Sequence, residues 1–418
     1  YKACLKKTQR KEGLKLSKFK WIITIIVAVV IVIGLNFYLN GKLCWIREAS
    51  AVNIVRRVVP GGPAQYLAQD GNYVVAVGIV SEENDDCALY LYDTKGTYDN
   101  FDDDTYTIID QIDSDNGWFT HVTIDDNYIT WIDSTGWSSC TALKLKGYYI
   151  PTEDLFVISS NVTDFMYSRD GNLVVYECKG NNSDIKLFNL NTKNESNICT
   201  ANNFQKKPYI KNNIVVWEDL RNEAITGKDI YMYNLGTNTE SVVSTDQGEQ
   251  KRAITNGSYV IYESILSGIK KINKFEISTG NTEIVTETAS ESISLEKKAI
   301  NDDYFVWEKV TGNNNELYSV NLYLHNISTS SNELIENQNT PIDDPISRYV
   351  FLNNNNQLVY GGYFKITGFD ITQNNKYVIR STGKTWWINL NSENTVIMHS
   401  YGAGNNLNEW DVSLAFIP

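Results

Sequence analysis

The sequence predicts an all-β fold in which one small sheet is repeated around a ring. A short apolar phrase recurs along the 418-residue chain, opened each time by Gly, Asp, Asn or Glu. The fifth residue after each opening residue serves as a marker: Ala76, Trp131, Tyr176, Trp217, Tyr262, Trp307, Tyr360 and Met398. Successive markers lie 38 to 55 residues apart. Repeats of about 40–50 residues with several short strands are typical of a β-propeller, in which each repeat forms one blade.

Each repeat reads as four strands separated by turn residues. The clearest copy begins at Gln205 and contains the segments KPYI, IVVWE, DIYMYNL and ESVVST. The last repeat supplies three such segments, and an unassigned strand at 52–59 precedes the first repeat. If that strand completes the last blade, two exposed sheet edges disappear. We therefore predict eight four-stranded blades over residues 52–418, with seven as the alternative because spacings of 55 and 53 residues leave the register open.

The N-terminal residues differ from the rest of the chain. Residues 1–20 are rich in lysine, and residues 21–39 carry no charge. As a helix, these 19 residues span about 28 Å, which is close to the hydrocarbon thickness of a bilayer. We predict a cytoplasmic segment 1–20, a transmembrane helix 21–39 in the cell membrane, a linker 40–51 and an extracytoplasmic propeller. A cleaved signal peptide is the alternative, with Ala49 and Ala51 at its cleavage site.

The net charge and the glycosylation sequons indicate which partners to expect. The net charge of −13 argues against nucleic-acid binding, which requires a basic surface. Five N-x-S/T sequons make Asn161, Asn181, Asn194, Asn256 and Asn326 candidates for glycosylation in an exported domain. The expected partners are the membrane, through residues 21–39, and a protein or glycan on one face of the propeller.

One repeat resembles a known family. Trp217, Asp219 and Arg221, followed by Asp229, Ile230 and Tyr231, match the pattern of the TolB-like propeller repeat. The other repeats keep the aromatic marker but lose the Asp and Arg. The resemblance implies a rigid interaction domain, which in this family is sometimes paired with a hydrolase domain. From its chemistry alone, Arg221 is expected to hold its loop by pairing with the two carboxylates Asp219 and Asp229.

The sequence offers few groups for familiar catalysis. No G-x-S-x-G elbow occurs, and the three histidines, His121, His325 and His399, share no ligand spacing. We therefore predict no catalytic residues, no metal site and no cofactor.

Basic residues recur ten positions before several markers, where the innermost strands begin. His121, Lys207, Arg252 and Lys297 lie there, and Arg348 has a similar place in a longer repeat. Because these strands line the central channel, the five residues are candidates for binding an anionic ligand. The competing interpretation is that they are ordinary solvated residues at strand entries.

These observations favour a non-catalytic binding or scaffold domain at the cell surface. One alternative is a channel-sited enzyme that acts on a polysaccharide, either a lyase or a glycosidase. Another is a structural subunit of a surface layer or filament. A shared pair of inward-facing carboxylates would favour the enzyme.

Overall fold

The computed structural model describes residues 53–56, 65–80, 86–96, 103–112, 117–135, 142–180, 182–313, 317–341, 349–361, 366–379, 384–390, 395–401 and 410–416. Residues 52–418 form one compact unit. The predicted segments 1–20, 21–39 and 40–51 lie outside the described residues. Within the described ranges, no helix is long and apolar enough to cross a membrane.

The described residues form antiparallel sheets, and most of these are meanders of four consecutive strands. The first contains β2 (Gln65–Asp70), β3 (Tyr73–Ile79), β4 (Cys87–Asp93) and β5 (Thr105–Ile112). The next is a seven-stranded sheet of β6 (Gly117–Asp125), β7 (Tyr128–Thr135), β8 (Ala142–Tyr149), β9 (Asp154–Asp170), β10 (Leu173–Lys179), β11 (Ser183–Asn189) and β12 (Asn194–Cys199). The short 3-10 helix η1 (Ile150–Thr152) joins β8 to β9.

Further four-stranded sheets follow along the chain. They are β13 (Gln205–Lys211), β14 (Ile214–Asp219), β15 (Asp229–Asn234) and β16 (Thr239–Ser244); then β17 (Glu249–Thr255), β18 (Tyr259–Leu266), β19 (Ile269–Glu276) and β20 (Thr282–Thr288). The next two are β21 (Ser292–Ile300), β22 (Tyr304–Asn313), β23 (Leu317–Asn326) and β24 (Ser331–Pro341); then β25 (Tyr349–Leu352), β26 (Gln357–Gly361), β27 (Ile366–Asp370) and β28 (Asn375–Ile379). Finally β29 (Lys384–Leu390), β30 (Thr395–Tyr401) and β31 (Trp410–Phe416) pair with β1 (Asn53–Arg56), which lies beside β31.

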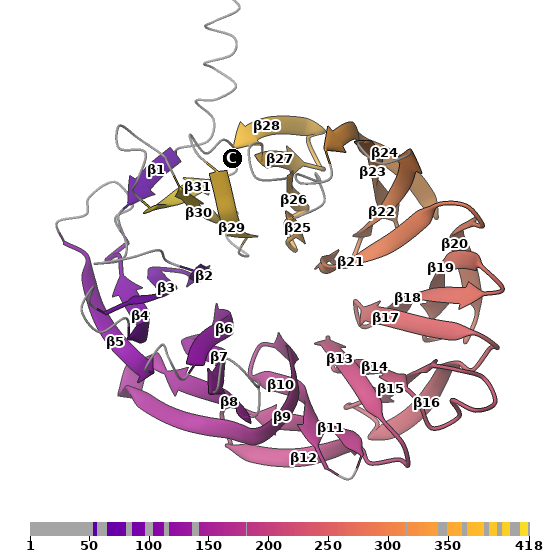
Figure 1. Ribbon diagram of the computed structural model, residues 1–418, viewed down its shortest axis with the longest axis horizontal. Helices are drawn as coiled ribbons and strands as arrows, with labels where there is room; N and C mark the ends of the chain where they lie inside the picture. The colour runs from indigo at the N-terminus through magenta and orange to yellow at the C-terminus, as the bar shows by residue number, and fades with distance from the viewer. Residues whose placement is uncertain are drawn as a thin grey trace, which may run out of the picture. The chain divides into compact units, whose positions relative to one another are not determined.

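The sheets are arranged as the blades of a β-propeller, with the first strand of each repeat nearest the centre (Figure 1). Contacts between innermost strands run around the ring from β2 to β6, β9, β13, β17, β21, β25 and β29, and β29 contacts β2 again. Each sheet therefore covers a face of its neighbour, which is how a propeller buries the apolar faces of small sheets. The all-β propeller fold predicted from the repeats is confirmed.

The marker residues form the cores between neighbouring sheets. Trp131, Tyr176, Trp217 and Tyr360 are almost completely buried, each with at most 1% of its surface exposed. Trp131 packs with residues of the preceding sheet, and Trp307 packs with Ile254 of β17. Since burial of a large side chain contributes about 2–3 kcal/mol, these aromatic markers add substantially to the apolar contact between neighbouring sheets.

Asparagine side chains link the inner hairpins of consecutive sheets. Asn212 Nδ2 donates to the backbone oxygen of Asn256, and Asn256 Nδ2 donates to that of Asn301. Asn301 Nδ2 continues the series by donating to Asn353 O at 2.8 Å. Asn256 is buried and its side chain takes part in this series, whereas glycosylation of the sequons stays a prediction. Asn161 and Asn194 are exposed, Asn326 is half-buried, and Asn181 lies outside the described residues.

The loop that carries the TolB-like pattern is held by Arg221, as expected. Its Nε and Nη2 donate to the two oxygens of Asp219, at 2.9 and 2.7 Å. Its second carboxylate partner is Glu240 of β16 rather than Asp229, and Asp229 instead accepts a hydrogen bond from Asn222. The sequence identified the arginine but not the second partner, because Glu240 reaches it only through the pairing of β15 with β16.

Candidate active site

A glutamate follows the marker in four consecutive repeats, and two of these residues fasten neighbouring blades together. Glu218 and Glu263 are buried. Oε1 of Glu218 accepts the backbone N–H of Arg252 in the next blade at 3.0 Å. In the same way, Oε1 of Glu263 accepts the backbone N–H of Leu295 at 2.9 Å. Each carboxylate thereby satisfies a backbone donor that the sheet itself leaves without a partner.

These backbone donors lie in bulges of the innermost strands. The register shifts after Thr120 in β6, after Lys206 in β13 and after Lys251 in β17. The next residue in each strand, His121, Lys207 or Arg252, has a left-handed backbone with φ between 51° and 54°. This conformation is unfavourable for side chains other than glycine, so tertiary contacts must hold it. The bulges redirect these three side chains, which the sequence had singled out as candidate ligands.

The cations at the bulges have carboxylate partners. Lys207 Nζ lies 3.4 Å from Glu218 Oε1, and Arg252 Nη1 lies 3.2 Å from Glu263 Oε1. His121 is exposed, and its Nδ1 lies 3.0 Å from Thr120 Oγ1. The buried glutamates therefore offset part of the positive field expected at the channel. Only the innermost strands were considered from the sequence, so these compensating glutamates, which lie on the second strand of each blade, were missed.

Lys297 does not occupy the position that its spacing predicted. Lys251 pairs with Glu263 across β17 and β18, and the equivalent pair in the next blade is Ser294 with Glu308. Leu295 is therefore the counterpart of Arg252, and Lys297 lies two residues further along a wider bulge that extends from Leu295 to Ile300. The side chain of Lys297 and the whole of Arg348 lie outside the described residues.

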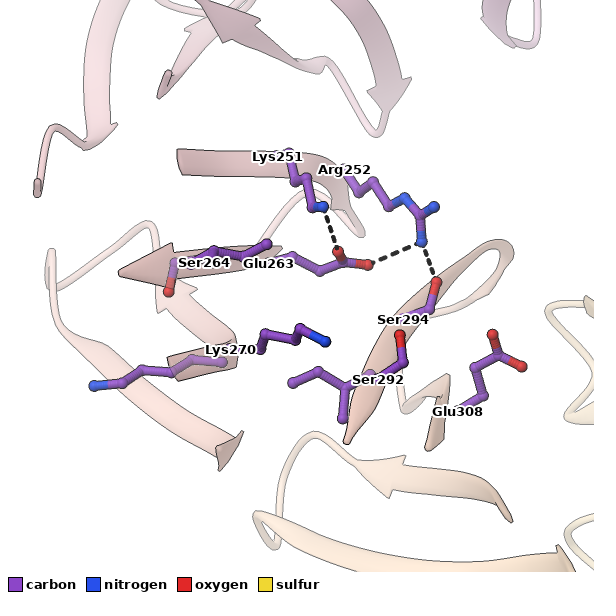
Figure 2. Close-up of a pocket in the computed structure, with 11 residues that line it drawn as sticks. Lys251, Arg252, Glu263, Ser264, Lys270, Ser292, Ser294 and Glu308 are labelled. Atoms are coloured by element: carbon purple, nitrogen blue, oxygen red, sulfur yellow. Dashed lines mark hydrogen bonds and ion pairs between the residues drawn. The ribbon is translucent and has the colours of Figure 1, made fainter. Parts of the chain in front are cut away.

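A polar cleft opens between the blade β17–β20 and the blade β21–β24. Its volume is about 290 Å³. Arg252 spans the gap, since Nη1 contacts Glu263 in its own blade and Ser294 Oγ on β21 (Figure 2). Lys251 also approaches Glu263, at 3.9 Å. The remaining lining residues include Ser264, Lys270, Lys271, Ser292 and Glu308.

Two further carboxyl groups belong to this region. Glu308 lines the cleft from β22, opposite Ser294 in the strand pair. Glu296 follows Ser294 by two residues on β21 and interacts electrostatically with Glu308, Arg252 and Glu263. Burial, together with the negative charges of Glu308 and Glu263, raises the pKa of Glu296 to about 8, although Arg252 acts in the opposite direction. At neutral pH, Glu296 is therefore mostly a neutral acid beside other carboxylates.

Sequence reasoning missed Glu263, Glu296 and Glu308. The signal for two of them was present, because VIYE and FVWE repeat a glutamate directly after the marker. Glu296 had no such signal, since only the register of β21 places it near the second-strand glutamates of two blades. The structure thus places Glu263 and Glu308 in the lining of one cleft and Glu296 within electrostatic range of both.

No family model matches the sequence, and no curated protein is significantly similar to it. Solved structures are similar in fold. An oligogalacturonate lyase from Vibrio parahaemolyticus is 11% identical, covers 86% of this chain and 99% of its own, and has a TM-score of 0.51. Dipeptidyl peptidase 4 from Porphyromonas gingivalis is 10% identical over 82% of this chain and 56% of its own, with a TM-score of 0.52. At these identities, the likeness establishes the β-propeller fold alone.

A putative TolB from Agrobacterium tumefaciens is also similar, at 13% identity over 54% of this chain and 80% of its own. Its TM-score of 0.33 is too low to single out the TolB-like repeat. The structural neighbours include TolB-like and other β-propeller proteins, and TolB-like is one possibility among them.

The expectation of a non-catalytic scaffold is contradicted. The finding that overturns it is that the solved structures with a similar propeller include a lyase and a peptidase. The expectation rested on the missing G-x-S-x-G elbow and the scattered histidines. Neither observation bears on catalysis by carboxyl groups, such as those of Glu296 and Glu308.

Proposed function

We propose that this protein is an enzyme that hydrolyses glycosidic bonds of a polysaccharide in the cleft between β17–β20 and β21–β24. The observation that carries the proposal is that Glu263 and Glu308 line one cleft beside Arg252, while Glu296 of β21 interacts electrostatically with all three. Glycoside hydrolysis requires one carboxyl group that is protonated and one that is ionised. Different surroundings for two nearby carboxyl groups provide that difference.

Each carboxyl group then has a defined role. Glu296 is the general acid, and it gives its proton to the glycosidic oxygen as the bond from that oxygen to the anomeric carbon breaks. Glu308 is the carboxylate that takes a proton from water, whose oxygen forms the new bond to the anomeric carbon. Glu263 remains a structural anion, because it is buried and already accepts bonds from Leu295 and Arg252.

The proposal is tested with the purified protein and a panel of neutral and acidic polysaccharides, by measuring new reducing ends. We expect Glu296→Gln and Glu308→Gln each to lower kcat about 10²- to 10⁴-fold. Glu287→Gln is the matched control, because Glu287 is exposed and pairs with Lys271 at the edge of the region. Products that carry an ultraviolet-absorbing double bond would show that the reaction is elimination and not hydrolysis. Equal activity of all three variants would reject these roles.

The pH profile gives a second test. Activity requires the protonated form of Glu296, so kcat/KM should fall on the basic side near pH 8, where this residue loses its proton. Glu296→Asp moves the carboxyl group and should change both the rate and the position of this limb. A profile that stays flat from pH 7 to about pH 9 would exclude Glu296 as the acid.

We further propose eight blades and an extracytoplasmic location. The seven-stranded sheet is long enough to supply two blades that share β9, and the pairing of β1 with β31 supports closure by residues 52–59. The lysine-rich residues 1–20 and the apolar residues 21–39 support a single membrane anchor with the propeller outside the cell. A polysaccharide of the cell surface or its surroundings is then within reach of the cleft.

A further inference from the structure

Cations outnumber carboxylates in the lining of the cleft. The lining contains Lys251, Arg252, Lys270 and Lys271, but only Glu263 and Glu308 carry carboxyl groups there. This excess stands out in a chain with a net charge of −13. A cleft with such walls concentrates anions relative to the rest of the surface.

Two of the ammonium groups are only weakly compensated. Lys270 Nζ donates to the backbone oxygen of Glu291 at 2.9 Å, and this contact brings no carboxylate. The carboxylate of Glu291 pairs instead with Lys309. Lys251 Nζ lies 3.9 Å from Glu263 Oε2, a distance beyond ordinary hydrogen-bond length. Lys251 also shares this carboxylate with Arg252.

Arg252 uses only part of its guanidinium group within the protein. Nη1 donates to both Glu263 and Ser294, while Nε and Nη2 have no partner among the described residues. Figure 2 shows one terminal nitrogen directed at these partners and the other directed away from them. The Nε and Nη2 edge is a planar fork of donors, which matches an oxyanion with two parallel hydrogen bonds.

Contacts at its backbone and at Nη1 also hold Arg252 in place. Glu218 of the preceding blade accepts the backbone N–H of Arg252, and Glu263 and Ser294 hold the other end of the side chain. An arginine fixed at both ends loses little further freedom when it binds a ligand. Preorganisation of this kind raises affinity without new contacts.

We propose that Arg252, together with Lys251 and Lys270, forms a subsite for an oxyanion on the sugar, a carboxylate or a sulfate, next to the bond that is cleaved. The inference rests on the proposed hydrolysis and names its substrate class, an acidic polysaccharide. Among the sequence candidates whose side chains the structure describes, Arg252 is the one that lines this cleft. Lys207 and His121 lie on other blades.

The subsite is coupled to the general acid. Arg252 lowers the pKa of Glu296, while Glu308 and Glu263 raise it. An oxyanion bound at the fork offsets the effect of Arg252, so the pKa of Glu296 should be higher in the complex. With an acidic substrate, the basic limb of kcat should therefore lie at higher pH than that of kcat/KM. With a neutral substrate, the two limbs should coincide.

The closing experiment separates binding from turnover. Equilibrium binding is measured on Glu296→Gln, which removes the proposed acid but leaves Arg252 in place, with polygalacturonate, alginate and a heparin-type glycan as probes. Each probe is paired with its methyl-esterified or desulfated form. We expect at least one charged probe to bind, and its neutral form to bind about 10- to 100-fold more weakly. The two kinds of pair distinguish carboxylate from sulfate.

Arginine variants then locate the subsite. In the same background, Arg252→Lys keeps the charge but loses the fork and should weaken binding about 10-fold, and Lys270→Gln should weaken it less. Lys95→Gln, an exposed change on another blade, should leave binding unchanged. Equal affinity for charged and neutral probes, or affinity that is indifferent to both Arg252→Lys and Lys270→Gln, would overturn the proposal. Charge-dependent binding with no cleavage by the parent protein would reject the hydrolysis and retain the subsite.

Discussion

Replacement of Glu296 by glutamine should make the protein more resistant to unfolding at alkaline pH. Burial, with the charges of Glu308 and Glu263, raises the pKa of Glu296 from 4.5 to about 8. Each tenfold change in proton affinity is worth about 1.4 kcal/mol, so the difference amounts to at most about 5 kcal/mol. Relaxation and water entry in the folded state reduce this value, and we expect at least about 2 kcal/mol.

The sign follows from which state releases the proton first. Below pH 4.5, both folded and unfolded chains hold the proton, and the stability associated with it is fully present. As the pH rises toward 8, the unfolded chain gives up the proton while the folded chain keeps it, so this stability is lost. Glutamine does not ionise, and the Glu296→Gln variant therefore escapes the loss.

Equilibrium urea unfolding at pH 5 and pH 9 measures the effect. The free energy of unfolding of Glu296→Gln, relative to the parent, should increase between these two conditions by about 2–5 kcal/mol. Comparing the two conditions cancels any packing effect that glutamine has at both pH values. For Glu287→Gln, an exposed carboxylate, the same comparison should give less than about 0.5 kcal/mol. If the parent and Glu296→Gln have the same pH dependence, the carboxyl group is ordinary, and its role as the acid fails too.

Further predictions concern the fold and its location. Glu218→Ala leaves the Arg252 backbone N–H without its acceptor and should cost about 1–3 kcal/mol in urea unfolding, most of which Glu218→Gln should restore; equal losses in both variants would contradict the blade contact. Arg221→Ala leaves Asp219 buried without its ion pair and should lower stability by about 3–5 kcal/mol, whereas an unchanged melting temperature would argue against that pairing. Deletion of residues 52–59 should expose the edge of β31 and either lower the melting temperature or cause association on size-exclusion chromatography; an unaffected monomer would mean another form of closure. Protease added to intact cells should remove the propeller, and full protection would refute the predicted orientation.

The repeat determined the fold because its signal is local and recurs many times. Trp131, Trp217 and Trp307 each end a similar short, mostly apolar segment, and all three are buried. The Asp219 and Arg221 pair was likewise readable, since two residues of one loop must meet. Lys297 shows the limit of this reasoning. Its spacing from the marker matched that of Arg252. Because the bulge of β21 is wider, however, Leu295 occupies the position equivalent to Arg252.

The sequence by itself determined a ring of antiparallel sheets, the residues that fill the spaces between them and a set of basic positions on the inner strands. These properties follow from the periodic recurrence of short segments, and each segment can be recognised from residues that are neighbours in the sequence. The tertiary structure decided which charges meet. Glu263 and Glu308 come from different blades, and Arg252 reaches across to Ser294 between them. Such contacts depend on bulge width and on the packing of one blade against the next, and neither is encoded in the spacing of any single repeat.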